Sequence, residues 1–500
     1  MPDPSPLNVL FIASEADPFI KVGGLADVAG SLPRALNKIG HLLPEQAPEV
    51  DIRLVIPYHP QVRRDLYSPQ PIIEFPVPTS EGEIVARVFT LELDGLCIYF
   101  IAGDPIDNES GVYSADLEAD GYKYIFFSMA SLELAKRLGW KPDILHANDW
   151  HTAAAVYALA LRRPDDIFYK RTASVLTVHN LPYLGSMTPP AMRAFGLPPA
   201  EDTDLPSWAR HMALPLGLLS ADAIVAVSPG YAREILTEEF GSGLAAFLKV
   251  HETKISGILN GLDTLKWDPN TDEHIAIKFS TSTLQDRETN KAILQQELGL
   301  EINTQLPLLA MVTRMDPQKG VDLAVEGLRL MLEARDAMNH PFQVVILGTG
   351  NPVLESAARL LQHDYPQSVC TRIMFSEPLS HRIYAGADML LMPSRYEPCG
   401  LSQMIAMRYG CVPIARSTGG LCDTIQDEAD QDQGTGFLFT PAKPEALVNA
   451  IHRAMEVYLH DPGAWQAIQL HGMQQDFSWD RSAHAYLKQY KLLLVNRKKV

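Results

Sequence analysis

Cysteine is scarce in this chain, and its spacing gives no sign of a cross-linked or metal-bound framework. The five cysteines are Cys97, Cys370, Cys399, Cys411 and Cys422. Their number is odd and no two are separated by two residues, so neither a disulfide framework nor a zinc site is predicted. This pattern fits a reducing compartment, and we expect a cytoplasmic protein.

The chain also lacks any surplus of positive charge. Its formal net charge is −18 at pH 7, which argues against broad binding to nucleic acids or anionic membranes. No apolar run is long enough to cross a bilayer. The start of the chain has neither a basic flank nor an apolar signal core, so no export is expected. An anionic substrate would need a few lysines and arginines gathered into a locally positive site.

Five hundred residues exceed what one hydrophobic core supports, so two or more domains are expected. Short apolar runs alternate with helical stretches in both halves, a pattern that predicts parallel sheets with crossover helices. The predicted strands are 8–13, 52–56, 98–102, 144–146, 174–178 and 223–227 in the first half, and 308–312, 343–347, 372–375, 389–392 and 412–415 in the second. Helices are predicted from about residue 25, over 124–138 and over 479–494.

The segment between the two halves is rich in Asp, Asn, Thr and Pro, which predicts a hinge over 260–283. The predicted domains are 1–259 and 284–475, and the tail 476–500 is predicted to be helical. The simplest architecture is α/β, with two doubly wound, Rossmann-like domains that face each other across a cleft. Ligands of such folds bind at the carboxyl ends of the strands.

A Gly-Gly-Leu segment occurs in each half, where a strand would turn into a helix. Gly23 and Gly24 follow Lys21 by one residue in the first, and Gly419 follows Thr418 in the second. Glycines let the backbone approach a ligand closely, and N–H groups at the next helix start favour a phosphate. The pair of segments predicts binding of a sugar nucleotide, although a tight turn with a surface lysine explains the first segment equally well.

Two further loops carry charged candidates. Arg314 and Lys319 lie between a predicted strand and the next helix, and are predicted to neutralise a diphosphate leaving group. Glu397 is predicted to point into the cleft, with N–H groups from Gly400 onward facing phosphate. The alternatives are solvated basic residues and a solvated carboxylate. Cys399 is not predicted to be a nucleophile, because no histidine adjoins it and buried cysteines are commonly structural.

Histidines follow two of the predicted strands. His146 and His151 are five residues apart, which is not the spacing of zinc ligands on a helix, so no metal site is predicted. Asp149, between them, is predicted to contact a sugar hydroxyl. His179 also ends a predicted strand. It is predicted to be a site residue only because the other candidate residues are expected at the same end of the sheet.

Together these segments resemble bacterial glycogen synthases and plant starch synthases. The resemblance covers nearly the whole chain in order, and its most specific motifs are Lys-x-Gly-Gly-Leu at 21–25, Gln-Lys-Gly at 318–320 and Glu-Pro-Cys-Gly-Leu at 397–401. The other matching segments are 146–151, 177–182, 257–263, 380–388, 417–421 and 477–479.

The resemblance implies a GT-B fold in which the last helix packs back on the first domain. It implies transfer of glucose from ADP-glucose to the non-reducing end of an α-1,4-glucan, such as glycogen, starch or a malto-oligosaccharide, with retained configuration. No metal or other cofactor is implied, because arginine and lysine stand at the diphosphate.

The resemblance also suggests roles for particular residues. The predicted catalytic residues are Glu397, His179 and Asp149. The predicted donor-binding residues are Lys21, Gly23, Gly24, Asn260, Arg314, Lys319, Phe375, Cys399, Gly400, Leu401, Thr418 and Gly419. Among them, Phe375 would stack on adenine, Asn260 would line the sugar pocket, and the backbone carbonyl of His179 would face the developing oxocarbenium ion.

Three positions depart from the family pattern. Met374 stands where the family usually has glycine, residues 121–124 replace a common Arg-Phe, and Ile405 stands where some retaining transferases have a second glutamate. Two other functions are therefore weighed: a retaining glucosyltransferase that uses UDP-glucose, and a catalytically silent glucan-binding relative. A glucan phosphorylase is disfavoured, because no convincing segment for a pyridoxal-phosphate lysine is present.

Overall fold

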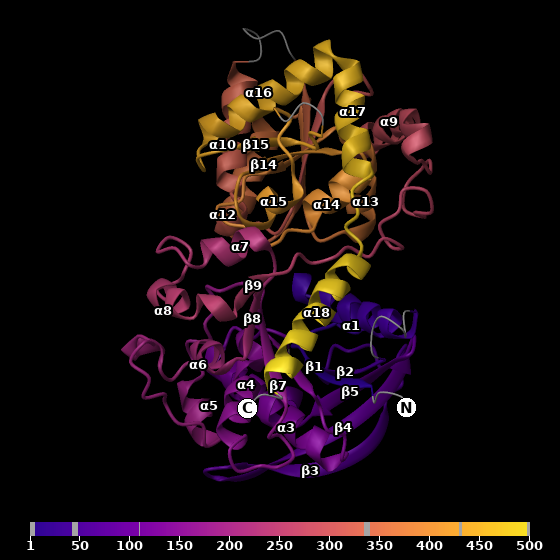
Figure 1. Ribbon diagram of the computed structural model, residues 1–500. Helices are drawn as coiled ribbons and strands as arrows, with labels where there is room; N and C mark the ends of the chain where they lie inside the picture. Colours follow the sequence, from indigo (N-terminus) through magenta and orange to yellow (C-terminus); the bar gives the residue numbers. More distant parts are fainter. Residues whose placement is uncertain (1–5, 43–48, 110, 335–340, 430–432, 498–500) are drawn as a thin grey trace. The chain divides into compact units, whose positions relative to one another are not determined.

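The computed structural model describes residues 6–42, 49–109, 111–334, 341–429 and 433–497. The chain divides into two compact units (Figure 1). Unit 1 comprises Met1–Gly261 and Ser478–Val500, and unit 2 comprises Leu262–Phe477. Within the described residues, no helix combines the length and apolar character that a bilayer crossing requires.

Unit 1 is built on a sheet whose described residues form nine strands. In spatial order these are β3 (Gln70–Thr79), β4 (Gly82–Leu93), β5 (Leu96–Ala102), β2 (Val50–Pro57), β1 (Leu7–Ile12), β6 (Ile144–Asn148), β7 (Ala173–Val178), β8 (Ala223–Ala226) and β9 (Ile255–Gly257). The strands from β5 to β9 in this order pair in parallel, whereas β3, β4 and β5 pair antiparallel. The parallel strands other than β9 are almost wholly buried, as expected where helices cover both faces of a sheet.

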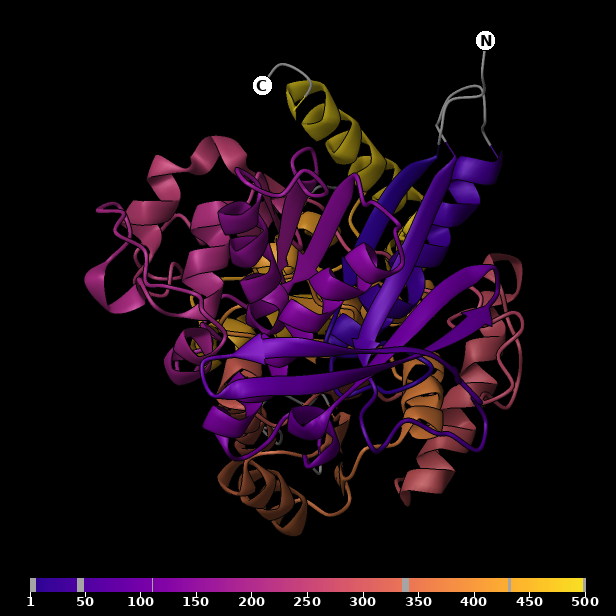
Figure 2. The ribbon, with the colours of Figure 1, turned by 90° about the horizontal axis from the view of Figure 1, so that it is seen from below.

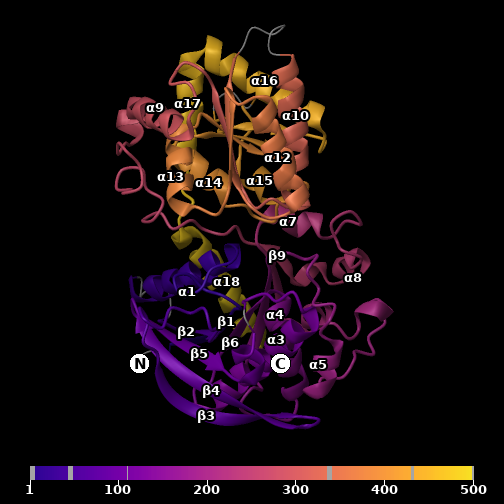
Figure 3. The same ribbon diagram turned by 180° about the vertical axis from the view of Figure 1, so that it is seen from behind.

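The helices of unit 1 lie between and after these strands in the chain, and several of them pack on the sheet. They are α1 (Gly24–Leu42), α2 (Asp104–Asp107), α3 (Leu117–Arg137), α4 (Asp149–Arg162), α5 (Pro189–Ala194), α6 (Ala213–Ser220), α7 (Pro229–Glu234), α8 (Ala245–Val250) and α18 (Trp479–Arg497). α4 packs on both α3 and α6, and α1 packs beside α18 (Figure 3). α18 is anchored by Trp479, Tyr486 and Tyr490, which are buried in the core that α1 shares with β1 and β2.

The strands β3 and β4 were not predicted, and they form the long antiparallel arm drawn in violet in Figure 2. Pro71, Pro76 and Pro78 lie in β3, and proline within a run normally argues against a strand. They are tolerated because β3 is an edge strand, where an N–H that faces solvent is dispensable. The arm ends at α5, where the Ser80 N–H donates to Ala194 O at 2.7 Å.

Unit 2 is a doubly wound parallel sheet. Its described strands run in the order β12 (Val369–Ile373), β11 (Gln343–Gly348), β10 (Leu308–Val312), β13 (Met389–Met392), β14 (Val412–Arg416) and β15 (Phe437–Phe439). Its helices are α9 (Arg287–Leu298), α10 (Val321–Glu333), α12 (Pro352–Asp364), α13 (Glu377–Gly386), α14 (Ser402–Arg408), α15 (Gly419–Thr424), α16 (Pro444–His460) and α17 (Pro462–Met473). α10, α12 and α16 cover one face, and α9, α13, α14 and α17 cover the other (Figures 1 and 3).

The predicted α/β class with two Rossmann-like units is confirmed, and β10 and β13 match their predicted strands residue for residue. β12 begins at Val369 and ends at Ile373, so the strand predicted over 372–375 lay too far along the chain. Residues 262–283, predicted as most of a hinge, pack within unit 2. There the ring of Trp267 stacks on His381 at 3.9 Å, and Asp272 accepts a hydrogen bond from Tyr409 at 2.6 Å. A hinge motion of this segment stays a prediction.

Candidate active site

Six of the predicted site residues lie at the carboxyl ends of parallel strands in unit 1. Lys21, Gly23 and Gly24 follow β1, Asp149 follows β6, His179 follows β7 and Asn260 follows β9. Because these strands are parallel members of one sheet, their carboxyl ends share one edge. The fold therefore gathers side chains that are up to 239 positions apart in the sequence.

The first Gly-Gly-Leu loop already holds an anion of the protein itself. The Glu15 carboxylate accepts the N–H of Val22 at 2.5 Å and the N–H of Gly23 at 3.1 Å. Tyr113 donates its hydroxyl to the same carboxylate at 2.9 Å. These two N–H groups are therefore engaged, and an N–H cradle for phosphate at this loop would have to start at Gly24. Lys21 makes an ion pair with Asp27 at 2.5 Å.

Asp149 adopts an unusual backbone conformation at the end of β6. Its φ of 55° is left-handed, a conformation that costs a non-glycine residue free energy and is enriched at functional sites. Its carboxylate accepts the backbone N–H of His179 at 2.7 Å and that of Asn180 at 3.4 Å. Burial raises the pKa of Asp149 to about 7, although the two N–H groups oppose that rise. The charge of this side chain is therefore poised near neutral pH.

The histidines of this edge are neutral. Burial lowers the pKa of His179 to about 3. Its Nε2 lies 2.9 Å from Asn148 Oδ1, and Asn148 donates its amide to Ile12 O, so His179 Nε2 carries the proton. Burial likewise lowers the pKa of His146 to about 3, and this ring bonds Tyr490 of α18 at 2.6 Å and Thr177 at 2.7 Å. His146 is thus a packing residue that ties α18 to the sheet.

Several buried polar atoms of unit 1 make no hydrogen bond within the described residues, and three of them follow the carboxyl ends of β6, β7 and β9. These three are Asn180 Oδ1, Asn260 Oδ1 and His151 Nδ1. Buried polar groups in folded proteins are nearly always paired. Each of the three residues follows a strand of the same sheet edge, so these atoms are suited to meet the hydroxyl groups of a polar ligand.

In unit 2, the remaining predicted site residues also follow carboxyl ends of strands. Arg314 and Lys319 follow β10, Phe375 follows β12, and Thr418 and Gly419 follow β14. The segment after β13 carries the others, which are Glu397, Cys399, Gly400 and Leu401. The arrangement is again one edge of one parallel sheet.

Lys319 and Glu397 meet directly. Lys319 Nζ lies 2.8 Å from Glu397 Oε1 and 2.6 Å from Oε2. Ser394 donates its hydroxyl to Oε2 at 3.0 Å. Glu397 is only 4% exposed, so its charge is matched by a cation rather than by bulk water. The sequence predicted a diphosphate contact for Lys319, and the structure adds this carboxylate as its partner.

Arg314 and Phe375 face solvent in unit 2. The Arg314 side chain is 59% exposed and forms an ion pair with Asp316 at 3.2 Å. Phe375 is 79% exposed, which is unusual for a large apolar ring. Its predicted stacking on adenine stays a prediction, and the open ring face leaves room for such a partner.

The second Gly-Gly-Leu segment and the Glu-Pro-Cys-Gly-Leu segment touch through their backbones. A Cβ on Gly420 would lie 2.2 Å from Cys399 O, and Gly420 donates its N–H to Glu397 O at 2.9 Å. Cys399 is buried, and Gly400 has a left-handed φ of 73°. These two loops are thus packed as one surface, in which glycine is required for contact.

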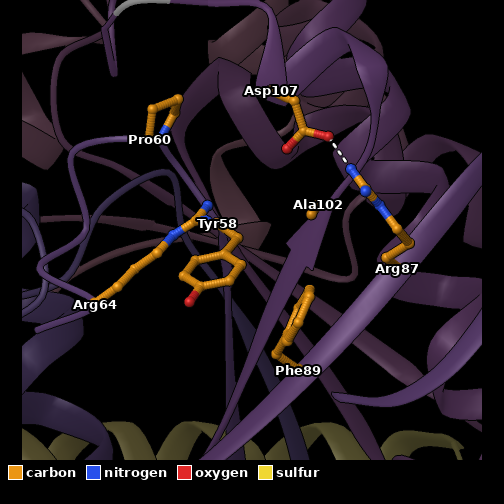
Figure 4. A pocket seen from close by; sticks show the side chains of 7 residues that line it. All are labelled: Tyr58, Pro60, Arg64, Arg87, Phe89, Ala102 and Asp107. Carbon is orange, nitrogen blue, oxygen red and sulfur yellow. Dashed lines mark hydrogen bonds and ion pairs between the residues drawn. The ribbon is translucent and has the colours of Figure 1, made fainter. Parts of the chain in front are cut away.

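A cavity of about 520 Å³ lies elsewhere in unit 1, and none of the predicted site residues lines it (Figure 4). Arg87 and Asp107 are ion-paired across it, and the Arg64 guanidinium covers the Tyr58 ring at 4.3 Å. Among the described residues, no three or more His, Cys, Asp or Glu side chains are grouped so that they could hold a metal ion.

Comparison with known proteins decides the family. The starch synthase catalytic domain family matches residues 8–250, and the glycosyl transferases group 1 family matches residues 295–461. Glycogen synthase from Thermotoga petrophila is 39% identical over 500 residues, covering 98% of this chain and 99% of the relative. The chain belongs to the glycogen and starch synthase family. Glycogen synthase from Geotalea daltonii is 38% identical over 98% of this chain and 100% of its own.

Solved structures agree with this assignment. The catalytic domain of starch synthase IV from Arabidopsis thaliana, bound to ADP and acarbose, has a TM-score of 0.86 and 31% identity, covering 98% of this chain and 100% of that chain. Sucrose-phosphate synthase from Thermosynechococcus elongatus, with a TM-score of 0.61 and 18% identity over 98% of this chain and 100% of its own, shares the fold. This chain is therefore a glycosyltransferase with a GT-B fold.

Several residues of the synthase site were not predicted. Glu15 and Tyr113 hold the Lys21 loop, and Ser394 bonds Glu397. Glu15 carried a weak signal, since it follows β1 directly, where site residues of this fold collect. Tyr113 and Ser394 lie in loops without such a signal.

Proposed function

We propose that this glycosyltransferase moves glucose from ADP-glucose to the non-reducing end of an α-1,4-glucan, with retention of configuration at the transferred carbon. The observation that carries the proposal is the Lys319–Glu397 pair, because it sets a cation for the leaving group beside an anion for the sugar. The starch synthase IV relative was solved with ADP and acarbose, which supports an adenine nucleotide donor here.

Binding of the leaving group, ADP, is assigned to residues of unit 2. The bond between glucosyl C1 and the diphosphate oxygen breaks, and ADP departs with the electron pair. Arg314 and Lys319 neutralise the charge that grows on the diphosphate. An ammonium group has three N–H donors, and Lys319 directs its Nζ at two Glu397 oxygens. The third N–H is then available to a phosphate oxygen, so one lysine serves both the leaving group and the carboxylate.

Sugar recognition is assigned to Glu397 in unit 2 and, within unit 1, to the polar residues at the carboxyl ends of its strands. Glu397 binds the glucosyl hydroxyls or offsets positive charge at C1. Asp149, Asn260 and the backbone carbonyl of His179 contact the sugar. The acceptor hydroxyl attacks C1 on the face that ADP leaves, and passes its proton to the departing diphosphate oxygen. The His179 ring takes no part as an acid, because burial lowers its pKa to about 3.

The remaining assignments concern cofactors, binding partners and cellular location. No metal or other cofactor is proposed, since the two cations of unit 2 supply the charge at the diphosphate. The proposed partners are ADP-glucose and an α-1,4-glucan, and the net charge of −18 disfavours nucleic acids and anionic membranes. None of the five cysteines, all of which lie in the described residues, forms a disulfide, and this supports a cytoplasmic location.

The test is incorporation of labelled glucose into glycogen, with the linkage and anomeric configuration of the product read by NMR. Wild-type protein is expected to extend α-1,4 chains from ADP-glucose. Incorporation from UDP-glucose alone would replace the donor in this proposal. Glycogen binding without incorporation from either donor would leave a glucan-binding relative.

A further inference from the structure

Arg395 joins the two loops that carry Lys319 and Glu397. We call residues 314–320, which follow β10, the lysine loop, and residues 393–401, which follow β13, the glutamate loop. The Arg395 guanidinium donates to Pro317 O in the lysine loop at 2.8 Å, and the Arg395 N–H donates to Gln318 O at 2.7 Å. One residue of the glutamate loop thus holds two consecutive carbonyls of the lysine loop.

The same guanidinium is fixed on its other side. Its two terminal nitrogens lie 2.8 Å and 2.6 Å from the two carboxylate oxygens of Asp322, in the second position of α10. Arg416, at the end of β14, donates to Arg395 O. Arg395 is therefore anchored to the helix α10 and to the end of strand β14, in addition to its contacts with the lysine loop.

Further contacts bring the two loops close together beside Arg395. Gln318 donates its amide to Tyr396 O at 3.3 Å. A Cβ on Gly320 would lie 2.1 Å from Pro393 O, so the two backbones approach as closely as glycine permits. Lys319 is the residue between Gln318 and Gly320, and Glu397 is two residues beyond Arg395. A shift of one loop against the other would therefore separate Lys319 from Glu397.

We propose that Arg395, together with Asp322, is a positioning residue for glucosyl transfer, which holds the lysine loop and the glutamate loop in the register that pairs Lys319 with Glu397. This inference rests on the proposed function of that pair. Arg395 itself touches neither reacting group. It acts by fixing the distance between a cation and an anion that must both be in place when the C1–oxygen bond breaks.

The geometry requires arginine in particular. Three acceptors surround the guanidinium, namely both Asp322 oxygens and Pro317 O, and a planar fork with five N–H donors reaches all of them at once. A lysine would keep the charge but not the fork. The Arg395 guanidinium also lowers the pKa of the Asp322 carboxyl, so the pair stays ionised at neutral pH.

The test compares Arg395→Lys with Arg382→Lys as a matched control. Arg382 also makes a two-pronged ion pair, with Glu297 at 2.7 Å for each contact, and it links α13 to α9 away from both loops. In the ADP-glucose assay we expect kcat of Arg395→Lys to fall by about 20-fold or more with KM changed less than about threefold, because transition-state contacts are lost more than ground-state binding. The control is expected to keep kcat within about twofold.

Two further readouts keep the inference testable if activity is ambiguous. Ethylguanidinium is expected to restore part of the kcat of Arg395→Ala, which a merely destabilised variant would not show. Independently of turnover, the energetic coupling between Lys319 and Glu397, measured by a double-mutant cycle, is expected to fall by more than half in the Arg395→Lys background. An unchanged coupling, or equal kcat losses in Arg395→Lys and the control, would overturn the inference. If wild-type protein transfers no glucose, the proposed function fails, and the coupling measurement still decides the role of Arg395.

Discussion

The Lys319–Glu397 ion pair should behave as a coupled, partly buried unit. The perturbation is a double-mutant cycle of Lys319→Met, Glu397→Gln and the combination, which removes each charge while keeping side-chain length. The Lys319 and Glu397 side chains are 18% and 5% exposed. Removing one partner from a fully buried pair costs about 3–5 kcal/mol. Because water still reaches Lys319, each single variant is expected to destabilise unit 2 by about 2–3 kcal/mol.

The double variant should cost less than the sum of the two. With both charges gone, no unpaired ion is left in the site, and a loss of about 1–2 kcal/mol is expected. The coupling, which is the sum of the two single losses minus the loss in the double variant, is then about 2–5 kcal/mol. Lys266 and Glu377 form a matched control at 2.7 Å in unit 2, with 29% and 36% of their side chains exposed. That pair is expected to show a coupling below about 1 kcal/mol.

The assay must isolate unit 2, because a chain with two units need not unfold in a single step. Denaturant-dependent hydrogen exchange at β10 and β13 does this, since the two loops start from these strands. Additive effects, with a coupling near that of the control pair, would refute the reasoning and show that Glu397 is satisfied without Lys319.

Four further predictions follow from other parts of the molecule. Burial raises the pKa of Asp149 to about 7, so the folded state keeps a proton that the unfolded chain has lost. Relative to Asp149→Asn, the unfolding free energy of the wild-type protein should therefore fall by about 1.4 kcal/mol per pH unit between roughly pH 4 and 7. A difference in unfolding free energy that does not change with pH, measured by chemical unfolding, would contradict this. Phe375→Ala should raise KM for ADP-glucose about tenfold with unchanged kcat and stability, if the ring stacks on adenine; steady-state kinetics decide this. Gly320→Ala combines a φ of 65° with a clash between the new Cβ and Pro393 O, so it should lower the unfolding free energy by about 2–4 kcal/mol. Gly299→Ala, which has open space at its Cβ, should lower it by only about 1 kcal/mol in the same chemical unfolding experiment. Dialysis against EDTA should leave glucosyl transfer unchanged, and activity restored only by an added divalent ion would show that a metal takes part.

The elements that the sequence predicts well are those whose burial is complete. β10 and β13 are short apolar runs inside a parallel sheet, so composition alone marks their ends. The arm of β3 and β4 escaped prediction because its edge strand carries three prolines. Whether a proline is tolerated depends on which strand lies at the edge, and that is a property of the assembled sheet.

The candidate site likewise contains features that the sequence predicts and contacts that it does not predict. The loops that hold Lys21, Arg314 and Glu397 could be predicted, because charged and glycine residues follow apolar strands. Their partners could not be predicted in the same way. Lys319 and Glu397 are 78 residues apart, and they meet only because β10 and β13 are neighbours in the sheet. Glu15 is close in sequence to the Lys21 loop, but its contact depends on the path that the loop takes back to β1.

The most direct test of the account is a competition between donors. Wild-type protein receives equimolar ADP-glucose and UDP-glucose carrying different labels, together with glycogen, and Glu397→Gln serves as the control. We predict that label from ADP-glucose enters the polymer in large excess, and that the control incorporates neither label at a comparable rate. Preferential incorporation from UDP-glucose, or undiminished incorporation by Glu397→Gln, would contradict the assignment of donor or of the Lys319–Glu397 pair.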